Sequence, residues 1–362
     1  MKLGIPKETL AGERRVATTP EIAKRLVGKG FEVLLEVGAG SAAHYPDQDY
    51  AEAGAQLVDR DLCFGADIVL KVRRPTDDEA GKVRSGALYI SLLESCGDDP
   101  LIGRMAANGV RVLGMERMPR ISRAQSMDAL SSQSNIAGYR AVIEAAAHYG
   151  RFLPMMMTSA GSAKPARLVV LGAGVAGLQA IATARRLGAD VYAYDVRPET
   201  REQIQSLGAK AIELDLGESG AGEGGYAKEL SDEAKARQQS LLADELAKAH
   251  IIISTALIPC RPAPELITAE VVQRMREGSV VVDLAAANGG NCKLTRADEV
   301  VVEHGVTLVG HTNYPSMVPA DASAFYARNL SNLLEIMVEQ GDSGLVLKDL
   351  AEDEITRAML VG

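Results

Sequence analysis

Three glycines and one aspartate form the pattern in this sequence that is most specific for binding a ligand. Gly172, Gly174 and Gly177 follow an apolar strand pattern and open a helix pattern over residues 175–187, and Asp195 ends the next strand pattern. This order of strand, glycine turn, helix, strand and acidic residue is typical of dinucleotide-binding folds. Gly172 would allow a tight turn, Gly174 would let backbone amides approach a pyrophosphate, and Gly177 would let the helix pack on the strand. The helix N-terminus would attract the phosphates.

The residues after the second strand pattern bear on which dinucleotide binds. A carboxylate at Asp195 would accept hydrogen bonds from both hydroxyls of the adenine ribose and repel a 2′-phosphate, which favours NAD(H) over NADP(H). Arg197 points the other way, because a nearby arginine can hold that phosphate. We give Asp195 the greater weight and expect Asp195, Val196 and Arg197 to surround the adenosine. Val175 is expected under the pyrophosphate turn, and Leu257 follows another strand pattern toward the same sheet edge.

Composition excludes several classes of protein. The chain has 362 residues, enough for two domains, with 47% hydrophobic and 24% charged residues. A net charge of −9 argues against nucleic-acid binding. Since the sequence has neither an apolar run of about 20 residues nor a signal-peptide core, we expect no direct membrane insertion. The four cysteines have no metal-ligand spacing, so we expect no metal.

Upstream of the glycine pattern, strand patterns alternate with helix patterns, which is typical of a parallel α/β sheet. These strand patterns lie at residues 2–6, 31–36, 56–58, 68–72, 88–92 and 110–114. We therefore predict two doubly wound, Rossmann-like α/β domains separated by a cleft. The first comprises residues 1–132 together with 320–362, which hold a long C-terminal helix pattern. The second, which binds the dinucleotide, comprises residues 133–319.

Two further segments bear on contacts with other molecules. Residues 151–166 contain two prolines, a glycine and three consecutive methionines, so we expect an extended excursion rather than a helix. Such a segment either forms a contact surface between molecules or fills the core, and the sequence favours neither. Residues 217–226 are rich in glycine and end in Tyr226, an aromatic residue that would fold over a bound nucleotide. The alternative is an insertion with no role in binding.

The chain resembles the alanine dehydrogenase and pyridine nucleotide transhydrogenase family over nearly its whole length. The matching segments include GIPKE at 4–8, ERRVATTP at 13–20, KVRRP at 71–75 and the glycine turn with its aspartate. Residues 118–135, MPRISRAQSMDALSSQSN, resemble the Arg-Gln-Asp loop of the NAD(H)-binding component of proton-translocating transhydrogenase. Residues 224–229, GGYAKE, resemble that component's mobile loop.

The resemblance implies direct hydride transfer between NADH on this chain and NADP⁺ on a partner subunit. The implied catalytic residues are Gln125, whose amide would bond the nicotinamide ribose, and Asp128 and Arg120, which would form an ion pair that shapes the loop. Arg123 and Ser131 are implied to lie beside them. The alternative is that these polar residues only cap the helix that begins near Ser131.

The resemblance also implies an assembly. Gly225, Tyr226 and Gln238 are implied to close over the cofactor. The chain is implied to form a homodimer and to associate with a membrane subunit and an NADP(H)-binding subunit. It would then lie on the cytoplasmic face of the membrane, held there by its partners, with residues 155–164 as the candidate contact between the two copies.

Alanine dehydrogenase is the alternative branch, and its chemistry needs groups that handle protons. By resemblance, its substrate-binding arginine and lysine match Arg15 and Lys71, whereas its histidine and aspartate match Ser91 and Ala287. The loss of both proton-handling groups counts against this branch. Hydride transfer between two nicotinamides releases no proton at the reacting carbons and so needs neither group. An NAD(H)-binding sensor that never transfers hydride is a third possibility.

Overall fold

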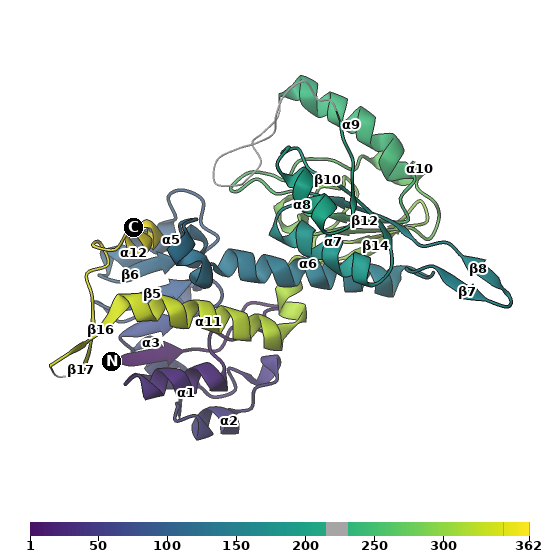
Figure 1. Ribbon diagram of the computed structural model, residues 1–362. Coiled ribbons are helices and arrows are strands. Elements are labelled where there is room, and N and C mark those ends of the chain that lie inside the picture. Colours follow the sequence, from purple (N-terminus) through teal and green to yellow (C-terminus); the bar gives the residue numbers. More distant parts are fainter. Residues whose placement is uncertain (215–230, 343, 362) are drawn as a thin grey trace. The chain divides into compact units, whose positions relative to one another are not determined.

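Two seven-stranded sheets organise the chain, one in each of two structural units (Figure 1). The computed structural model describes residues 1–214, 231–342 and 344–361. The first unit comprises residues 1–133 and 315–362, and the second comprises residues 134–314, so the division falls inside one long helix, α6 (Ala129–His148). The two sheets confirm the predicted α/β class with two parallel-sheet, Rossmann-like domains.

The sheet of the first unit has the strand order β3-β2-β1-β4-β5-β6-β18. All its pairings are parallel except β18 with β6, and the order reverses between β1 and β4. Such a reversal is the point where doubly wound folds bind ligands. The strands are β1 (Lys2–Ile5), β2 (Glu32–Glu36), β3 (Gln56–Val58), β4 (Ile68–Leu70), β5 (Leu88–Ser91), β6 (Arg111–Gly114) and β18 (Leu360–Val361).

The sheet of the second unit repeats this topology as β11-β10-β9-β12-β13-β15-β14. Its parallel order reverses between β9 and β12, and only β14 runs antiparallel. The second unit therefore has its own switch point, at the end of β9. The strands are β9 (Arg167–Leu171), β10 (Asp190–Tyr194), β11 (Lys210–Ala211), β12 (Ile251–Ser254), β13 (Val280–Asp283), β14 (Val300–Glu303) and β15 (Val306–Val309).

Helix starts follow the capping residues in the sequence. Thr19 accepts a hydrogen bond from the Ile22 amide and Pro20 occupies the first position of α1 (Pro20–Gly28), as predicted. The other helices of the first unit are α2 (Asp47–Glu52), α3 (Arg60–Phe64), α4 (Asp77–Lys82), α5 (Pro100–Ala107), α11 (Pro319–Met337) and α12 (Glu354–Met359). Those of the second are α7 (Val175–Arg186), α8 (Thr200–Ser206), α9 (Asp232–Ala247) and α10 (Ala269–Arg274).

Helix α11 completes the core of the first unit although it lies more than 300 residues from β1 in sequence. Its buried side chains pack in one cluster with Leu3 and Ile5 of β1 and Leu35 of β2. Each large apolar side chain buried in this way contributes roughly 2 kcal/mol of hydrophobic free energy. The α11 side chains in this cluster are Tyr326, Ala327, Leu330, Leu333, Leu334 and Met337.

The segment 151–166 is extended, as predicted, and forms a hairpin of β7 (Met156–Thr158) and β8 (Gly161–Ala163). Met155 and Met157 are 63% and 76% exposed, and Phe152 is 58% exposed. These values exclude core filling within this chain.

Three antiparallel pieces differ from what the sequence predicts. The sequence predicts the strand near residues 307–309 as the last one, but β14 pairs with β15 just before it, and β18 pairs with β6 near the C-terminus. A further hairpin joins β16 (Val338–Gly341) to β17 (Gly344–Leu347). These strands lie at sheet edges or outside the two large sheets, so they lack the continuous apolar run that marks a buried parallel strand.

Candidate functional site

The glycine turn after β9 has the geometry that its sequence pattern predicts. Gly172 adopts φ +91°, a conformation that residues with a side chain rarely adopt. A Cβ on Gly177 would lie 1.8 Å from the carbonyl oxygen of Gly172, so α7 packs directly against the turn. A Cβ on Gly174 would meet no atom of the described residues within 4 Å. The space in front of Gly174 is thus open where a phosphate would approach.

This turn joins the strand ends at the switch point of the second sheet. The Gly172 amide donates to the Tyr194 carbonyl at the end of β10 (2.8 Å), and the Thr255 hydroxyl after β12 lies 3.1 Å from the Leu171 and Gly172 carbonyls. The first amides of α7 point toward the opening, because the first turn of a helix has no internal acceptors for them. These residues fit a dinucleotide phosphate on the helix N-terminus.

A glycine outside the fingerprint also supports the turn. A Cβ on Gly138 in α6 would lie 2.0 Å from the Ala176 carbonyl oxygen, in the first turn of α7. Sequence reasoning assigned no role to Gly138. The signal that points to it is a lone glycine in the middle of a strong helix pattern.

Asp195, at the end of β10, is not the open carboxylate that the sequence suggested. Its Oδ1 accepts hydrogen bonds from the Arg197 amide and Nε, both at 2.9 Å. Its Oδ2 accepts from the Ala173 amide at 2.6 Å and from Arg197 Nη2 at 2.8 Å. The hydrogen bond to Asp195 raises the pKa of the Arg197 guanidinium, against the opposing effect of burial. The two residues that we weighed as opposing signals are therefore ion-pair partners.

The other predicted residues of the second unit divide into two groups. Val175 and Leu257 are 38% and 41% exposed, and Val196 is half-buried beside Asp195. Gln238, in contrast, is buried in α9 and donates from Nε2 to the Tyr194 hydroxyl at 3.0 Å. Gln238 thus braces the end of β10. Gly225 and Tyr226 lie outside the described residues.

In the first unit, the segment with the predicted catalytic residues is held from below and presents Gln125 outward. Ala124 and Met127 of the short helix η3 (Ser122–Met127) are buried, whereas Gln125 is exposed. The Ser126 carbonyl accepts from the side-chain amides of Asn329 (2.9 Å) and Asn332 (3.0 Å) of α11. Two amides on one carbonyl fix the height of the segment, so the Gln125 side chain starts from a rigid base.

Asp128 and Ser131 are joined to each other. Asp128 Oδ1 accepts from the Ser131 amide (2.9 Å) and Oδ2 accepts from the Ser131 hydroxyl (2.5 Å), which caps α6. Capping is the alternative interpretation that the sequence left open for Asp128. The ion pair of Asp128 with Arg120 and the contact of all three residues with nicotinamide stay predictions.

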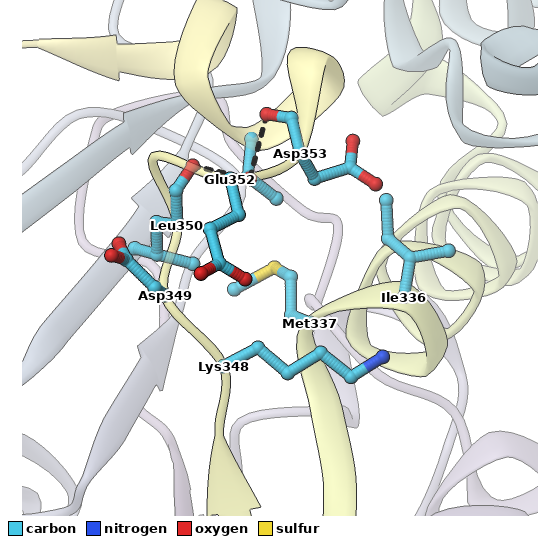
Figure 2. A pocket seen from close by; sticks show the side chains of 8 residues that line it. Ile336, Met337, Lys348, Asp349, Leu350, Glu352 and Asp353 are labelled. Carbon is cyan, nitrogen blue, oxygen red and sulfur yellow. Dashed lines mark hydrogen bonds between the residues drawn. The ribbon is translucent and has the colours of Figure 1, made fainter.

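Arg123 is bound to the C-terminal segment of the first unit. Its guanidinium donates to both carboxylate oxygens of Asp353 at 2.8 and 2.9 Å, and Glu354 lies 3.5 Å away. Figure 2 shows a pocket that Asp353 lines, beside Lys348 and Glu352, where Thr356 donates to the Leu350 carbonyl at 2.6 Å. The charge of Arg123 is balanced there, so its contact with nicotinamide also stays a prediction.

A cluster of buried charges fills the switch point of the first sheet. Lys71, after β4, lies 2.8 Å from a carboxylate oxygen of Glu79 and 3.3 Å from Oε2 of Glu8, after β1. Glu79 also pairs with Arg60, and Glu8 Oε1 accepts from the Val72 amide at 2.6 Å. Where the second sheet opens onto a glycine turn, the first is closed by ion pairs of its own.

Burial raises the pKa of Glu8 to about 7, and the neighbouring Lys71 opposes this only in part because Lys71 lies closer to Glu79. A carboxyl whose pKa is higher in the folded than in the unfolded chain stabilises the fold below about pH 4.5 and loses that contribution as the pH rises through 7. Glu8→Gln stays neutral at every pH. The free energy of unfolding of the wild type relative to Glu8→Gln should therefore fall by on the order of 3 kcal/mol between pH 4.5 and 8.

Urea denaturation of both proteins at several pH values measures this difference. Thr9→Val, which removes a hydroxyl that donates to Glu79 but no ionisable group, serves as the control and should follow the wild-type pH profile. Parallel profiles for wild type and Glu8→Gln would contradict the raised pKa.

The residues that bear on the alanine dehydrogenase alternative have structural partners. Arg15 forms two hydrogen bonds with the Glu13 carboxylate (2.6 and 2.8 Å) and one with Gln133 (2.8 Å), all buried. Ser91 is fully buried at the end of β5, and Ala287 has no side chain for proton transfer. Arg15, like Lys71, thus has carboxylate partners from the chain itself.

Comparison with known proteins places this site in a family. The N-terminal domain of the alanine dehydrogenase/PNT family matches residues 4–137, and its C-terminal domain matches residues 141–361. The chain belongs to the alanine dehydrogenase/PNT family. Within it, the chain is 50% identical over 363 residues to an NAD(P) transhydrogenase subunit alpha chain of Rhodospirillum rubrum, covering 98% of this chain and 94% of that protein.

Solved structures of family members show the same fold. The transhydrogenase from Sinorhizobium meliloti matches with a TM-score of 0.84 and 47% identity over 93% of this chain and 94% of that chain. An L-alanine dehydrogenase matches with a TM-score of 0.76 and 28% identity over 93% and 89% of the two chains. The resemblance predicted from the sequence is confirmed, and the transhydrogenase branch has the higher identity.

Two searches of the described residues bear on partners and metals. Every helix in the described ranges is too short or too polar to cross a membrane. The His, Cys, Asp and Glu side chains in the same ranges form no group of three that would hold a metal ion.

Proposed function

We propose that this chain is the NAD(H)-binding component of a transhydrogenase, in which hydride passes directly between NADH on this chain and NADP⁺ on a partner subunit. The observation that carries the proposal is a nucleotide-binding turn at Gly172–Gly177 in a chain with Ser91 and Ala287 at the two proton-handling positions of alanine dehydrogenase. The identity to transhydrogenase subunits supports it.

Each group of residues has a task in this reaction that needs no acid or base. The bound nicotinamide supplies the hydride. The turn at Gly174 holds the phosphates, Asp195 receives the adenine ribose, and Gln125 holds the nicotinamide ribose so that the ring faces its acceptor. Positioning of two reactants is the main source of rate in such a transfer. Arg120 and Asp128 support the segment that carries Gln125.

The proposed assembly is a homodimer that associates with an NADP(H)-binding subunit and a membrane subunit on the cytoplasmic face of a membrane. The β7–β8 hairpin supports the homodimer, because Phe152, Met155 and Met157 expose apolar surface at one protrusion. Met157→Asp would bury a charge in the contact, which costs several kcal/mol.

Met157→Asp should therefore convert the dimer to a monomer at micromolar concentration while the chain stays folded. Sedimentation of the variant beside Thr158→Asp, which adds the same charge one residue along the hairpin with its side chain on the other face of the strand, measures this. A dimeric Met157→Asp protein would exclude the hairpin as the contact.

The transfer itself is tested by rapid mixing. The chain loaded with an oxidised NAD analogue is mixed with an NADPH-loaded NADP(H)-binding component, with each protein omitted in turn. Rapid reduction of the analogue that needs both proteins is the expected result. Tight NADH binding and complex formation without transfer would favour the sensor alternative, and turnover of alanine with NAD⁺ would favour the dehydrogenase branch.

A further inference from the structure

The Asp195 carboxylate has all of its acceptor positions occupied. A carboxylate offers about four lone-pair sites. Four donors take them: the Ala173 amide, the Arg197 amide, and Nε and Nη2 of the Arg197 side chain, at 2.6 to 2.9 Å. A ribose hydroxyl can therefore bond to Asp195 only if one of these donors leaves.

The two backbone donors cannot leave without unfolding the site. The Ala173 amide belongs to the glycine turn, and the Arg197 backbone is held because its carbonyl accepts from the Thr200 amide (3.2 Å) and hydroxyl (2.7 Å). The Arg197 guanidinium, in contrast, lies at the end of a flexible side chain. It is the donor that can be exchanged.

The pairing also changes the electrostatics of the site. Asp195 and Arg197 are 6% and 11% exposed and form a two-pronged ion pair, so together they carry no net charge. A neutral pair has little power to repel a 2′-phosphate. Selection of NAD(H) through the negative charge of Asp195 would operate only when the guanidinium is elsewhere.

We propose that the Arg197 guanidinium competes with the adenine ribose for Asp195, so that binding of the nucleotide opens this ion pair. The proposal rests on the proposed NAD(H)-binding function. It makes Arg197 a residue that weakens NADH binding and offsets the repulsion of NADPH, rather than one that adds affinity for the nucleotide. The affinity of the site for NADH is thereby held below what Asp195 alone would give.

Arg197→Gln is the direct test, with Arg201→Gln as the matched control. Arg201 lies four residues further on, is 54% exposed and pairs with Glu213, so the control removes the same charge nearby without touching Asp195. Arg197→Gln should lower the Kd of NADH about tenfold, the value of one charged hydrogen bond no longer displaced, while Arg201→Gln stays within about twofold of wild type. The ratio of NADPH Kd to NADH Kd should rise, because the Asp195 charge is uncovered.

Two more titrations separate the ribose from the rest of the nucleotide. Reduced nicotinamide mononucleotide lacks the adenine ribose and should bind wild type and Arg197→Gln equally. Arg197→Lys keeps the charge but cannot form the two-pronged pair, so its Kd for NADH should fall by a smaller factor. This variant also provides the test if Arg197→Gln fails to fold.

An Arg197→Gln protein that binds NADH no more tightly than Arg201→Gln, or an Arg197→Lys protein with wild-type Kd, would overturn the competition. Weaker binding of NADH to Arg197→Gln would make the guanidinium a nucleotide contact instead. A wild-type chain that binds no NADH would overturn the proposed function itself, so the two failures are distinguishable.

Discussion

Gln125→Asn should slow hydride transfer about 100-fold and change the Kd of NADH less than about threefold. The variant keeps the amide but shortens the side chain by one methylene, and the segment beneath it is fixed by Asn329 and Asn332 on the Ser126 carbonyl. The backbone therefore cannot follow the shortened amide, and a misplacement of about 1 Å costs on the order of 100-fold in such a reaction.

Stopped-flow transfer rates and NADH titrations measure the two quantities. Gln273→Asn, at an exposed position of α10, removes the same methylene and should leave both unchanged. Equal losses of rate and affinity in Gln125→Asn would mean that Gln125 binds the nucleotide without positioning the ring.

Gly174→Ala and Gly177→Ala should fail in opposite ways. A Cβ on Gly177 meets the Gly172 carbonyl at 1.8 Å, which is backbone and cannot turn aside, so this variant should lose about 2–3 kcal/mol of unfolding free energy without any ligand. A Cβ on Gly174 points into open space, and its cost is limited to the weaker cap, about 1 kcal/mol. The same Cβ occupies the place of a phosphate and should weaken NADH binding at least tenfold.

Urea denaturation of the free proteins and NADH titration of the folded variants measure the two effects. Gly150→Ala, where a Cβ meets no described atom within 4 Å, controls for the loss of glycine flexibility. Wild-type affinity in Gly174→Ala would contradict phosphate binding at this turn.

Regular, buried elements were predictable from the sequence. The parallel strands at the switch points are continuous apolar runs, and α1 begins at the Thr19 cap with Pro20. The edges were not predictable in the same way. Strand β14 has only one neighbouring strand, and Val300 and Val302 point to solvent, so its pattern resembles that of a loop beside a turn.

The candidate site was predictable in residue type but not in pairing. The glycines and Asp195 mark the turn, yet the sequence cannot show that the Arg197 side chain folds back two residues to fill the carboxylate. The support beneath Gln125 was missed for a different reason. Asn329 lies 203 residues from Ser126 in sequence and acts through a backbone carbonyl, which has no residue type to signal it.

The closure of the first unit by α11 has a consequence for synthesis on the ribosome. Residues 134–314 form the second unit without interruption, so that unit can fold as soon as it emerges. The first unit begins to emerge earlier but lacks Tyr326, Leu330 and Leu334, which fill its core from the other side of the second unit in sequence. Its exposed β1 and β2 must wait, bound by chaperones or loosely collapsed, until α11 has left the ribosome. A chain that stalls before α11 would thus carry one finished nucleotide-binding unit and one that is open to proteolysis.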